Sequence, residues 1–234
     1  MDLSIIIVSY NVAELLRGCI RSIYENTKKI EFEIWVVDNQ SADNSAEMVE
    51  KEFPQVHLIR NNINGGFSQA NNLAIMQATG EYILILNPDT IVTPNALEKV
   101  IEFYVNHSDA GAVGCKLIKA DGTLDIACKR GFPTVWNSLC KVLKLNKVFP
   151  KSKFTGGYNL TYLDENETHS IDCLVGAFMM LRRDVIEAVG MLDEKFFMYG
   201  EDIDWCYRIK SSGYTIYYYP EAVIYHLKGE SSKK

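Results

Sequence analysis

Along the first half of the chain, segments with the continuous apolar pattern of a buried strand alternate with segments whose apolar positions recur at helical spacing. Residues 3–8 form a continuous apolar run rich in β-branched side chains, which is typical of a strand buried on both faces. Residues 12–25 repeat apolar positions at helical spacing and predict an amphipathic helix. By the same criteria, further strands are predicted at residues 32–37, 56–59 and 82–86, and further helices at residues 45–53, 67–79 and 94–106.

This alternation predicts an α/β fold with a mainly parallel central sheet and helices on both of its faces. Ligands in such folds bind beyond the carboxyl ends of the strands. Polar residues follow each of the first four strands: Ser9, Tyr10 and Asn11, then Asp38 and Asn39, then residues 61–67, then residues 87–89. Loops favour polar residues in any protein, so each set alone also fits ordinary loop chemistry. Their recurrence at four strand ends indicates a ligand site along that edge.

The second half of the chain is less regular. It predicts strands at residues 112–118, 173–181, 214–219 and 222–225, a hairpin turn at residues 120–123, a polar loop at residues 151–169, and helices at residues 133–148, 183–189 and 202–212. The composition does not break sharply anywhere along the chain. We therefore expect a single domain that spans residues 1–234.

Composition narrows the class of protein. The chain has 234 residues, 47% of them hydrophobic and 23% charged, with a net charge of −6, so we expect no nucleic-acid partner. The six cysteines form no C-x-x-C pair, and we expect them to be reduced in a cytoplasmic protein. Apolar runs fall far short of the ~20 residues that span a bilayer. Lys228, Lys233 and Lys234 fit either a solvated tail or the start of a basic extension that faces a membrane.

The segment Asn87-Pro88-Asp89 follows directly on the apolar run at residues 82–86. Pro88 ends the strand and fixes the turn, so Asp89 projects from the carboxyl end. One interpretation makes Asp89 a turn or helix-capping residue. The other makes it a ligand of a hard cation, which takes oxygen ligands and needs one or two carboxylates.

A second acidic cluster lies at Glu201, Asp202 and Asp204, at the start of a predicted helix. Acidic residues are favoured there by the helix dipole, so a capping role is one interpretation. Apolar neighbours, Trp205 among them, would desolvate a carboxylate and raise its pKa toward the range of a general base. Residue types alone leave the two interpretations open.

Two further features bear on the chemistry: the polar stretch 61–67 and His226. The polar stretch 61–67 opens a helix whose first N–H groups would face an anion, but it is neither a Walker-type loop nor a G-x-G-x-x-G turn. This argues against a kinase or a dinucleotide-dependent dehydrogenase. His226 follows a strand-like segment and fits either a hydrogen-bonded structural residue or a third metal or phosphate ligand.

Together, these motifs resemble those of the inverting glycosyltransferases of the GT-A fold, family 2, and within it the rhamnosyltransferase-like branch. The segments that carry the resemblance occur in the family's order and are residues 4–11, 36–43, 64–67, 70–72, 86–89, 176–178, 199–205 and 226–231. One departure is Asn87, which stands where the family's D-x-D pattern has its first acid.

The resemblance implies a Rossmann-like nucleotide-sugar-binding half at residues 1–110 and an acceptor-binding half at residues 111–234. It implies Asp202 as the general base, with Glu201 second, and Asp89 and His226 around Mg²⁺ or Mn²⁺. The donor nucleotide would be bound by Ser9, Tyr10, Asn11, Asp38, Asn39, Asn64, Gly65 and Asn87, and the acceptor by Gly176, Ala177 and Trp205.

The function implied is transfer of a sugar, with inversion, from a dTDP- or UDP-sugar such as dTDP-rhamnose to a glycan or lipid-linked acceptor, in polysaccharide synthesis of the bacterial type. Peripheral association with the inner face of the membrane is part of this expectation. One alternative is a catalytically silent nucleotide- or glycan-binding module, which loss of Asp89 or Asp202 would favour; both are present. Another is a nucleotidyltransferase, but residues 9–12 do not form its glycine-rich basic loop.

Overall fold

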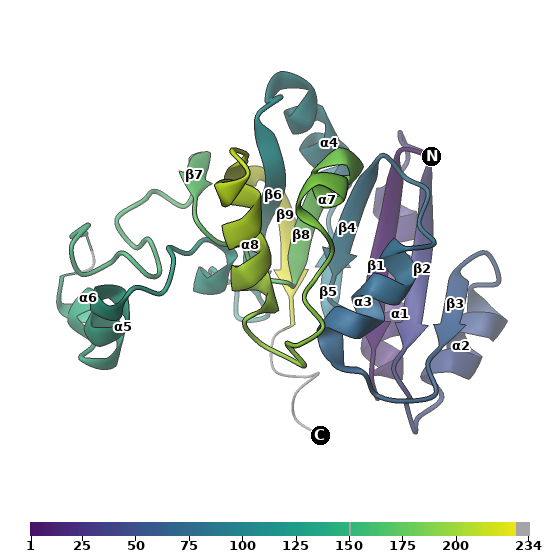
Figure 1. The fold of residues 1–234 in the computed structure, drawn as a ribbon. Coiled ribbons are helices and arrows are strands. Elements are labelled where there is room, and N and C mark those ends of the chain that lie inside the picture. Colours follow the sequence, from purple (N-terminus) through teal and green to yellow (C-terminus); the bar gives the residue numbers. More distant parts are fainter. Residues whose placement is uncertain (150, 228–234) are drawn as a thin grey trace.

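The computed structural model describes residues 1–149 and 151–227. A central sheet in the order β3-β2-β1-β4-β8-β6-β9-β5 runs through the described residues, and β7 pairs with the remaining part of β9. The closing segment around Gly229 and Ser231, with the three C-terminal lysines, lies outside the described residues. Figure 1 shows helices on both faces of the sheet, with α3 on the near face and α1 behind.

The first half confirms the strand–helix alternation predicted from the sequence. The parallel strands are β1 (Leu3–Ser9), β2 (Phe32–Asp38), β3 (His57–Arg60) and β4 (Tyr82–Leu86), and the helices between them are α1 (Ala13–Asn26), α2 (Ser45–Glu52) and α3 (Gly66–Ile75). All five residues of β4 are buried, which explains its unbroken apolar sequence. The carboxyl ends of these strands meet at the lower edge in Figure 1.

The second half adds antiparallel strands to the sheet. Its elements are β5 (Thr90–Val92), α4 (Ala96–Asn106), β6 (Ala110–Lys119), the short 3-10 helix η1 (Ile126–Cys128), β7 (His169–Ile171), β8 (Phe178–Arg182), α7 (Arg183–Val189), α8 (Glu201–Ser211) and β9 (Thr215–His226). Strand β8 runs antiparallel to both β4 and β6, whereas β9 is parallel to β6.

The mainly parallel arrangement is therefore a property of the first half. Two neighbouring strands can be parallel only if the connection between them crosses back to the end of the sheet at which the first strand began. Between β6 and β8, helices α5 (Val135–Val142) and α6 (Leu145–Val148) lie away from the sheet instead of crossing it (Figure 1). The chain thus re-enters the sheet at the end where β6 finished, and β8 therefore runs antiparallel to β6.

Several element bounds differ from the sequence prediction, and three of these differences lie in the second half. Strand β9 is continuous where two strands were expected, because a register shift between Cys115 and Lys116 accommodates Pro220. The strand predicted at residues 173–181 begins only at Phe178. The helix predicted at residues 133–148 is divided at Lys144, whose φ of 54° is left-handed.

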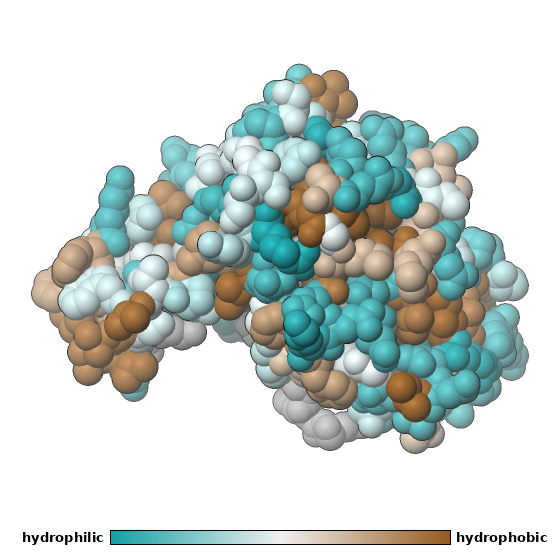
Figure 2. Space-filling model, viewed as in Figure 1, coloured by the Kyte–Doolittle hydropathy of each residue, from teal (hydrophilic) through white to brown (hydrophobic). Residues whose placement is uncertain are grey.

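Residues 132–163, which contain α5 and α6, form a projection that we call the arm (Figure 1). The space-filling view shows hydrophobic atoms gathered on the lower side of the arm (Figure 2). All six cysteines of the chain are buried free thiols. Across residues 1–149 and 151–227, no helix combines the length and the apolar character that crossing a membrane requires.

Candidate active site

The ends of β1 and β2 carry two buried polar atoms that lack a hydrogen-bond partner among the described residues. These atoms are the hydroxyl oxygen of Ser9 and Oδ1 of Asp38. The two residues lie opposite each other in the parallel register, and the Ser9 carbonyl accepts the N–H of Asn39 at 2.8 Å. Oδ2 of Asp38 accepts the N–H of Ser41 at 3.1 Å. Because buried polar groups are normally satisfied, the two free atoms mark a place where a ligand can bind.

Tyr10 and Asn11 have different roles in the turn after β1. Asn11 adopts a left-handed φ of 56°, and its side-chain oxygen accepts the N–H of Ala42 at 2.7 Å. Its own N–H donates to the hydroxyl of Ser41 at 3.0 Å. Asn11 therefore ties the turn after β1 to the turn after β2, whereas the Tyr10 side chain is half exposed and free to face a ligand.

The start of α3 corrects one expectation from the sequence. Three of its N–H groups are already used: Gly65 donates to Oδ1 of Asn39, Gly66 donates to Oδ1 of Asn64, and Phe67 donates to the carbonyl of Phe197. Asn39 also donates to Asn64 at 2.7 Å. Asn64 and Gly65 thus hold neighbouring loops together, and these three N–H groups are not available to an anion.

Gly66 is required where the loop before α8 docks on α3. Its φ of 80° is left-handed, and a Cβ at this position would lie 2.3 Å from the carbonyl oxygen of Phe197. A side chain would therefore separate the two loops.

Asp89, His226 and Asp125 form a buried row at the end of β4 and β9. Nε2 of His226 lies 3.4 Å from Oδ1 of Asp89, and Nδ1 lies 3.0 Å from Oδ2 of Asp125. Each of the three is at most 4% exposed. Thr90 pairs with His226 in the sheet, and the backbone carbonyl of Asp89 accepts the N–H of Leu227 at 2.8 Å, so β5 and β9 fix the geometry.

The charge of His226 is set by two opposing effects. Burial lowers the pKa of the imidazole, but the hydrogen bonds and charges of Asp125 and Asp89 outweigh burial and raise the pKa to about 9. The ring is then protonated at neutral pH, and each nitrogen carries a proton that points at a carboxylate. Sequence reasoning missed Asp125, whose visible signal is only local: its side chain caps η1 by accepting the N–H of Ala127.

Asn87, Gly176 and Ala177 lie together where β4 and β8 meet. The N–H of Asn87 donates to the carbonyl of Ala177 at 3.1 Å, and the carbonyl of Asn87 accepts the hydroxyl of Thr90 at 2.8 Å. Gly176 packs against the ring of Phe67, and both Gly176 and Ala177 are buried. The expected acceptor residues Gly176 and Ala177 therefore lie beneath the surface and shape the site through their backbone.

The start of α8 holds the acidic pair. Two left-handed residues, Tyr199 and Gly200, turn the chain into the helix, and Glu201 and Asp202 are buried in its first turn. Asp202 accepts a hydrogen bond from Arg130 at 2.5 Å and another from the N–H of Ile203 at 2.8 Å. Arg130, which also donates to the carbonyl of Leu174, was not singled out from the sequence.

Glu201 differs from its neighbour. Its Oε2 is buried and has no hydrogen-bond partner among the described residues. Burial raises the pKa of the Glu201 carboxyl, and the charge of Asp202 adds to that effect while Arg130 opposes it. The pair therefore combines one carboxylate fixed by an ion pair with one carboxyl that holds a proton more readily.

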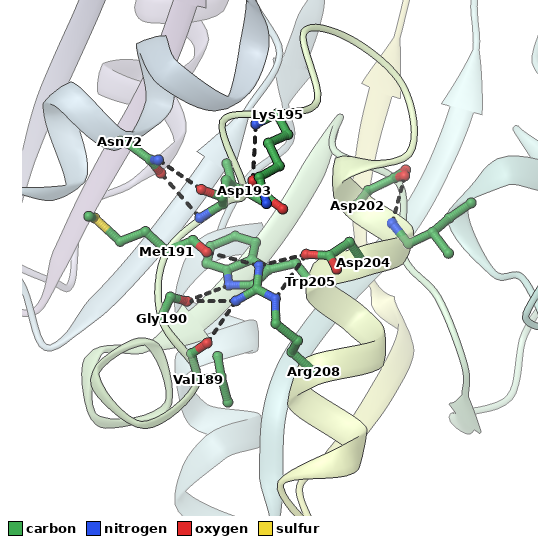
Figure 3. Close-up of polar contacts among 12 residues, drawn as sticks. Asn72, Val189, Gly190, Met191, Asp193, Lys195, Asp202, Asp204, Trp205 and Arg208 are labelled. Carbon is green, nitrogen blue, oxygen red and sulfur yellow. Dashed lines mark hydrogen bonds and ion pairs between the residues drawn. The ribbon is translucent and has the colours of Figure 1, made fainter.

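Trp205 was expected to bind the acceptor, but the structure places it in the core. Its side chain is fully buried, and Nε1 donates to the carbonyl of Gly190 at 2.9 Å. Figure 3 shows how Arg208 extends this anchor: it donates to Asp204 at 2.8 Å and to the carbonyl of Met191 at 2.9 Å. These contacts fasten the loop after α7 to α8.

An open cavity of about 510 Å³ lies beside the acidic pair. It is lined by Phe132, Pro133, Phe196, Gly200, Ile203, Asp204 and Tyr207. Gly200 and Ile203 flank Glu201 and Asp202 in sequence, so the cavity borders the first turn of α8. Sequence reasoning did not group these residues, because Phe132 and Pro133 are about 70 positions away from the others.

Two family models together match nearly the whole chain. The model described as glycosyl transferase family 2 matches residues 4–190, and the model described as glycosyl transferase family group 2 matches residues 151–232. The chain belongs to glycosyl transferase family 2. The acidic residues at the carboxyl edge and at α8 thus lie in a glycosyltransferase that acts in glycan biosynthesis.

Curated relatives of this family 2 protein include rhamnosyltransferases. It is 24% identical to the N-acetylglucosaminyl-diphospho-decaprenol L-rhamnosyltransferase of Mycobacterium tuberculosis, over 98% of this chain and 77% of the relative. It is 26% identical to the rhamnosyltransferase WbbL of Escherichia coli, over 92% of this chain and 80% of the relative. These matches agree with the rhamnosyltransferase-like resemblance seen in the motifs.

Solved structures confirm the GT-A fold. The mannosyltransferase PcManGT from Pyrobaculum calidifontis, in complex with GDP-Man and Mn²⁺, matches with a TM-score of 0.69 and 20% identity, over 98% of this chain and 57% of that one. GalNAc-T7 with UDP, GalNAc and Mn²⁺ matches with a TM-score of 0.72 and 16% identity, over 97% and 44%. The chain spans less than two thirds of both structures, and likeness at this identity concerns the fold alone.

Proposed function

We propose that this glycosyltransferase moves a sugar from a nucleoside-diphosphate donor to an acceptor hydroxyl and inverts the anomeric carbon. The observation that carries the proposal is the placement of two acidic groups along one edge of the sheet. Asp89 lies at the end of β4, and the pair Glu201 and Asp202 opens α8. Transfer needs charge stabilisation at the leaving diphosphate and a base at the acceptor, and these groups supply both.

The donor base binds at the ends of β1 and β2 in this proposal. The free Oδ1 of Asp38 accepts an N–H of a pyrimidine ring, and the free hydroxyl of Ser9 lies beside it. The half-exposed Tyr10 completes the wall of the pocket. The resemblance to rhamnosyltransferases favours a dTDP- or UDP-sugar, with dTDP-rhamnose as the first donor to test.

The residues at the end of β4 fit a divalent cation when the donor supplies the remaining ligands. Asp89 offers carboxylate oxygen, and His226 offers a nitrogen after losing a proton; this set suits Mn²⁺ or Mg²⁺. Within residues 1–149 and 151–227, no group of three or more His, Cys, Asp or Glu side chains could hold an ion by itself. A bound cation would neutralise charge that gathers on the leaving diphosphate. We therefore expect metal affinity to depend on bound nucleotide.

Asp202 is the general base in this proposal. It removes the proton from the acceptor hydroxyl, the acceptor oxygen bonds to the anomeric carbon, and the bond to the diphosphate breaks on the opposite side. Arg130 holds the carboxylate in one orientation through its 2.5 Å contact. Glu201 is the second candidate, because its raised pKa and free oxygen also suit a base.

The acceptor occupies the cavity beside α8. Its aromatic and apolar wall, with Phe132, Phe196 and Tyr207, suits the apolar or ring face of a glycan or lipid-linked acceptor. Asp204 and the backbone at Gly200 supply polar groups at the rim. This surface replaces the buried Gly176, Ala177 and Trp205 as the acceptor contact.

The direct test measures donor hydrolysis and sugar transfer from dTDP- and UDP-sugars with Mg²⁺ or Mn²⁺. Asp202→Asn is expected to lower the rate by about 10²–10⁴-fold, the usual contribution of a general base. Asp121→Asn, an exposed residue on the turn after β6, is the matched control and should keep full activity. An unchanged rate in Asp202→Asn would move the base assignment to Glu201.

Thermal shifts with nucleoside diphosphates separate an enzyme from a silent binding module. A nucleotide at 100 times its Kd stabilises the native state by about 2.7 kcal/mol. We expect Mn²⁺ to enlarge the shift given by UDP or dTDP, and Asp89→Asn to remove that enlargement. Nucleotide binding without hydrolysis or transfer of any donor would favour the silent module.

A further inference from the structure

The arm exposes apolar side chains that no other part of the described structure covers. Val135, Val142 and Val148 are 90%, 77% and 65% exposed, and Phe149 is 59% exposed. Val135, Leu139, Val142 and Leu143 recur at the spacing of one helical face in and just after α5. In an amphipathic helix of a soluble domain, such a stripe faces the core; here it faces outward.

Charge along the arm differs from that of the rest of the protein. Residues 132–163 contain five lysines, at positions 141, 144, 147, 151 and 153, and no aspartate or glutamate. The whole chain nevertheless has a net charge of −6. The arm is therefore a basic and apolar element on an acidic protein.

Internal contacts give the arm a defined shape. Trp136 donates from Nε1 to the carbonyl of Phe154 at 2.8 Å, and the two rings lie 4.5 Å apart. At the base, Gly131 donates to the carbonyl of Tyr158 at 2.9 Å, and Lys129 donates to the carbonyl of Leu160 at 2.9 Å. The exposed stripe is thus presented by an ordered element and is not an unfolded segment.

We propose that the arm docks the protein on a bilayer surface that contains anionic phospholipids. Its apolar stripe enters the headgroup region, the exposed Lys144, Lys151 and Lys153 contact lipid phosphates, and the paired rings of Trp136 and Phe154 lie at the interface. The chemistry of the arm, apolar side chains with positive charge and no negative charge, is that of interfacial helices. This inference adds a binding surface to the proposed function and does not depend on the donor or on turnover.

The arm is also placed to connect a membrane with the acceptor cavity. Phe132 and Pro133, the first residues of the arm, line that cavity. Arg130, two positions earlier, contacts Asp202. An arm held at the bilayer therefore brings the acidic pair close to the surface from which a lipid-linked acceptor would be presented.

A second copy of the chain is a poorer occupant of this surface. Two arms packed against each other would bring ten lysines together without a compensating acid, and like charges repel. Self-association through the arm is therefore an outcome that the test must detect, and it would contradict the proposal.

The test is co-sedimentation of the full chain with vesicles. Vesicles of phosphatidylcholine with about 30 mol% phosphatidylglycerol should bind the protein, pure phosphatidylcholine should bind it far less, and raising the salt from about 0.1 M to 1 M should release it. The triple variant Lys144→Glu, Lys151→Glu and Lys153→Glu should lose about 100-fold or more in partitioning. No nucleotide or acceptor is present, so failure here is distinct from failure of the transfer assay.

Two matched controls test whether the effect depends on the arm itself or only on the change in charge or hydrophobicity. The variant Lys28→Glu, Lys29→Glu and Lys51→Glu makes the same change in net charge on exposed residues outside the arm and should bind vesicles like the wild type. Val142→Ser with Val148→Ser should weaken binding, whereas Val105→Ser with Met76→Ser, at similar exposure (77% and 63%), should not. Equal loss in the arm variants and the control variants would overturn the proposal.

Tryptophan fluorescence locates the contact. Trp136 is 40% exposed, whereas Trp205 is fully buried, so insertion should shift the emission of Trp136 to the blue when anionic vesicles are added. Trp136→Phe should abolish the shift and retain most of the binding. Absence of vesicle binding by the wild type, or concentration-dependent dimerisation that Val142→Ser with Val148→Ser abolishes, would overturn the proposal.

Discussion

Arg130 and Asp202 form a buried ion pair in which Nη2 donates to Oδ2 across 2.5 Å. The two residues are 72 positions apart, one just before the arm and the other in the first turn of α8. Burial lowers the pKa of the guanidinium, but the charge and the hydrogen bond of Asp202, together with Tyr158, outweigh burial and raise that pKa. The pair therefore locks the loop at the base of the arm to the acidic pair of the site.

Breaking this pair should cost stability. Arg130→Met is expected to lower the free energy of unfolding by about 3–5 kcal/mol, because it leaves the Asp202 carboxylate buried without a partner. Denaturant unfolding measures the loss. The control Arg21→Met removes an exposed contact with Glu52 and should cost less than about 1 kcal/mol.

The double variant Arg130→Met with Asp202→Leu tests whether the unpaired Asp202 carboxylate causes the loss of stability. Removing both charges should restore part of the stability lost in Arg130→Met, because no isolated charge remains. If the double variant loses at least the sum of the two single changes, the ion pair is not the reason for the loss.

Glu201 should give stability a pH dependence of known sign. Burial raises the pKa of this carboxyl above its ordinary value of 4.5, with a contribution from Asp202 and opposition from Arg130. In the window just above pH 4.5 the native state then holds the proton more often than the unfolded state does, so stability falls as pH rises. Glu201→Gln should remove this part of the slope and stabilise the protein at neutral pH.

Unfolding curves of Glu201→Gln and wild type at acidic and neutral pH check this expectation. The exposed Glu187→Gln is the control with the same change of charge. Two parallel pH profiles for Glu201→Gln and wild type would contradict the assigned effect of burial.

Asp38 should determine which nucleotide the protein prefers. Its free Oδ1 is the proposed acceptor for a pyrimidine N–H, so Asp38→Ala is expected to weaken UDP or dTDP binding by about 10–100-fold. Calorimetric titration should show little change for ADP, and the effect of Mn²⁺ on the remaining binding should persist. An equal loss for purine and pyrimidine nucleotides would indicate a general disturbance of the loop.

Trp205 should affect stability and leave the acceptor interaction intact. Trp205→Phe removes the hydrogen bond to Gly190 and part of a fully buried ring, at an expected cost of about 1–3 kcal/mol. Measured below the unfolding transition, the KM for the acceptor should remain that of the wild type. By contrast, Tyr207→Ala, which opens the wall of the cavity, should raise that KM.

The strands and helices of the first half, and the family, could be predicted from the amino-acid pattern alone. Leu3–Ser9, Phe32–Asp38 and Tyr82–Leu86 were readable because strands buried on both faces need continuous apolar runs, and helices between them need a 3.6-residue period. The motifs could be located in order along the chain because each one follows a predicted strand or opens a predicted helix. Asp89 and the pair at the start of α8 therefore appeared as candidates before their surroundings were known.

Which of these groups are available to a ligand, and which side chains face them, depends on contacts between segments that are distant in sequence. Asp125 contacts His226, which is 101 positions away, and Arg130 contacts Asp202, which is 72 positions away. Contacts between residues so far apart leave no periodic pattern in the sequence. Local pattern likewise could not show that Trp205 is buried, that three N–H groups at the start of α3 are already bonded, or that β8 runs antiparallel to β4. Burial and pairing depend on contacts between elements distant in sequence, and those contacts form only when the chain has folded.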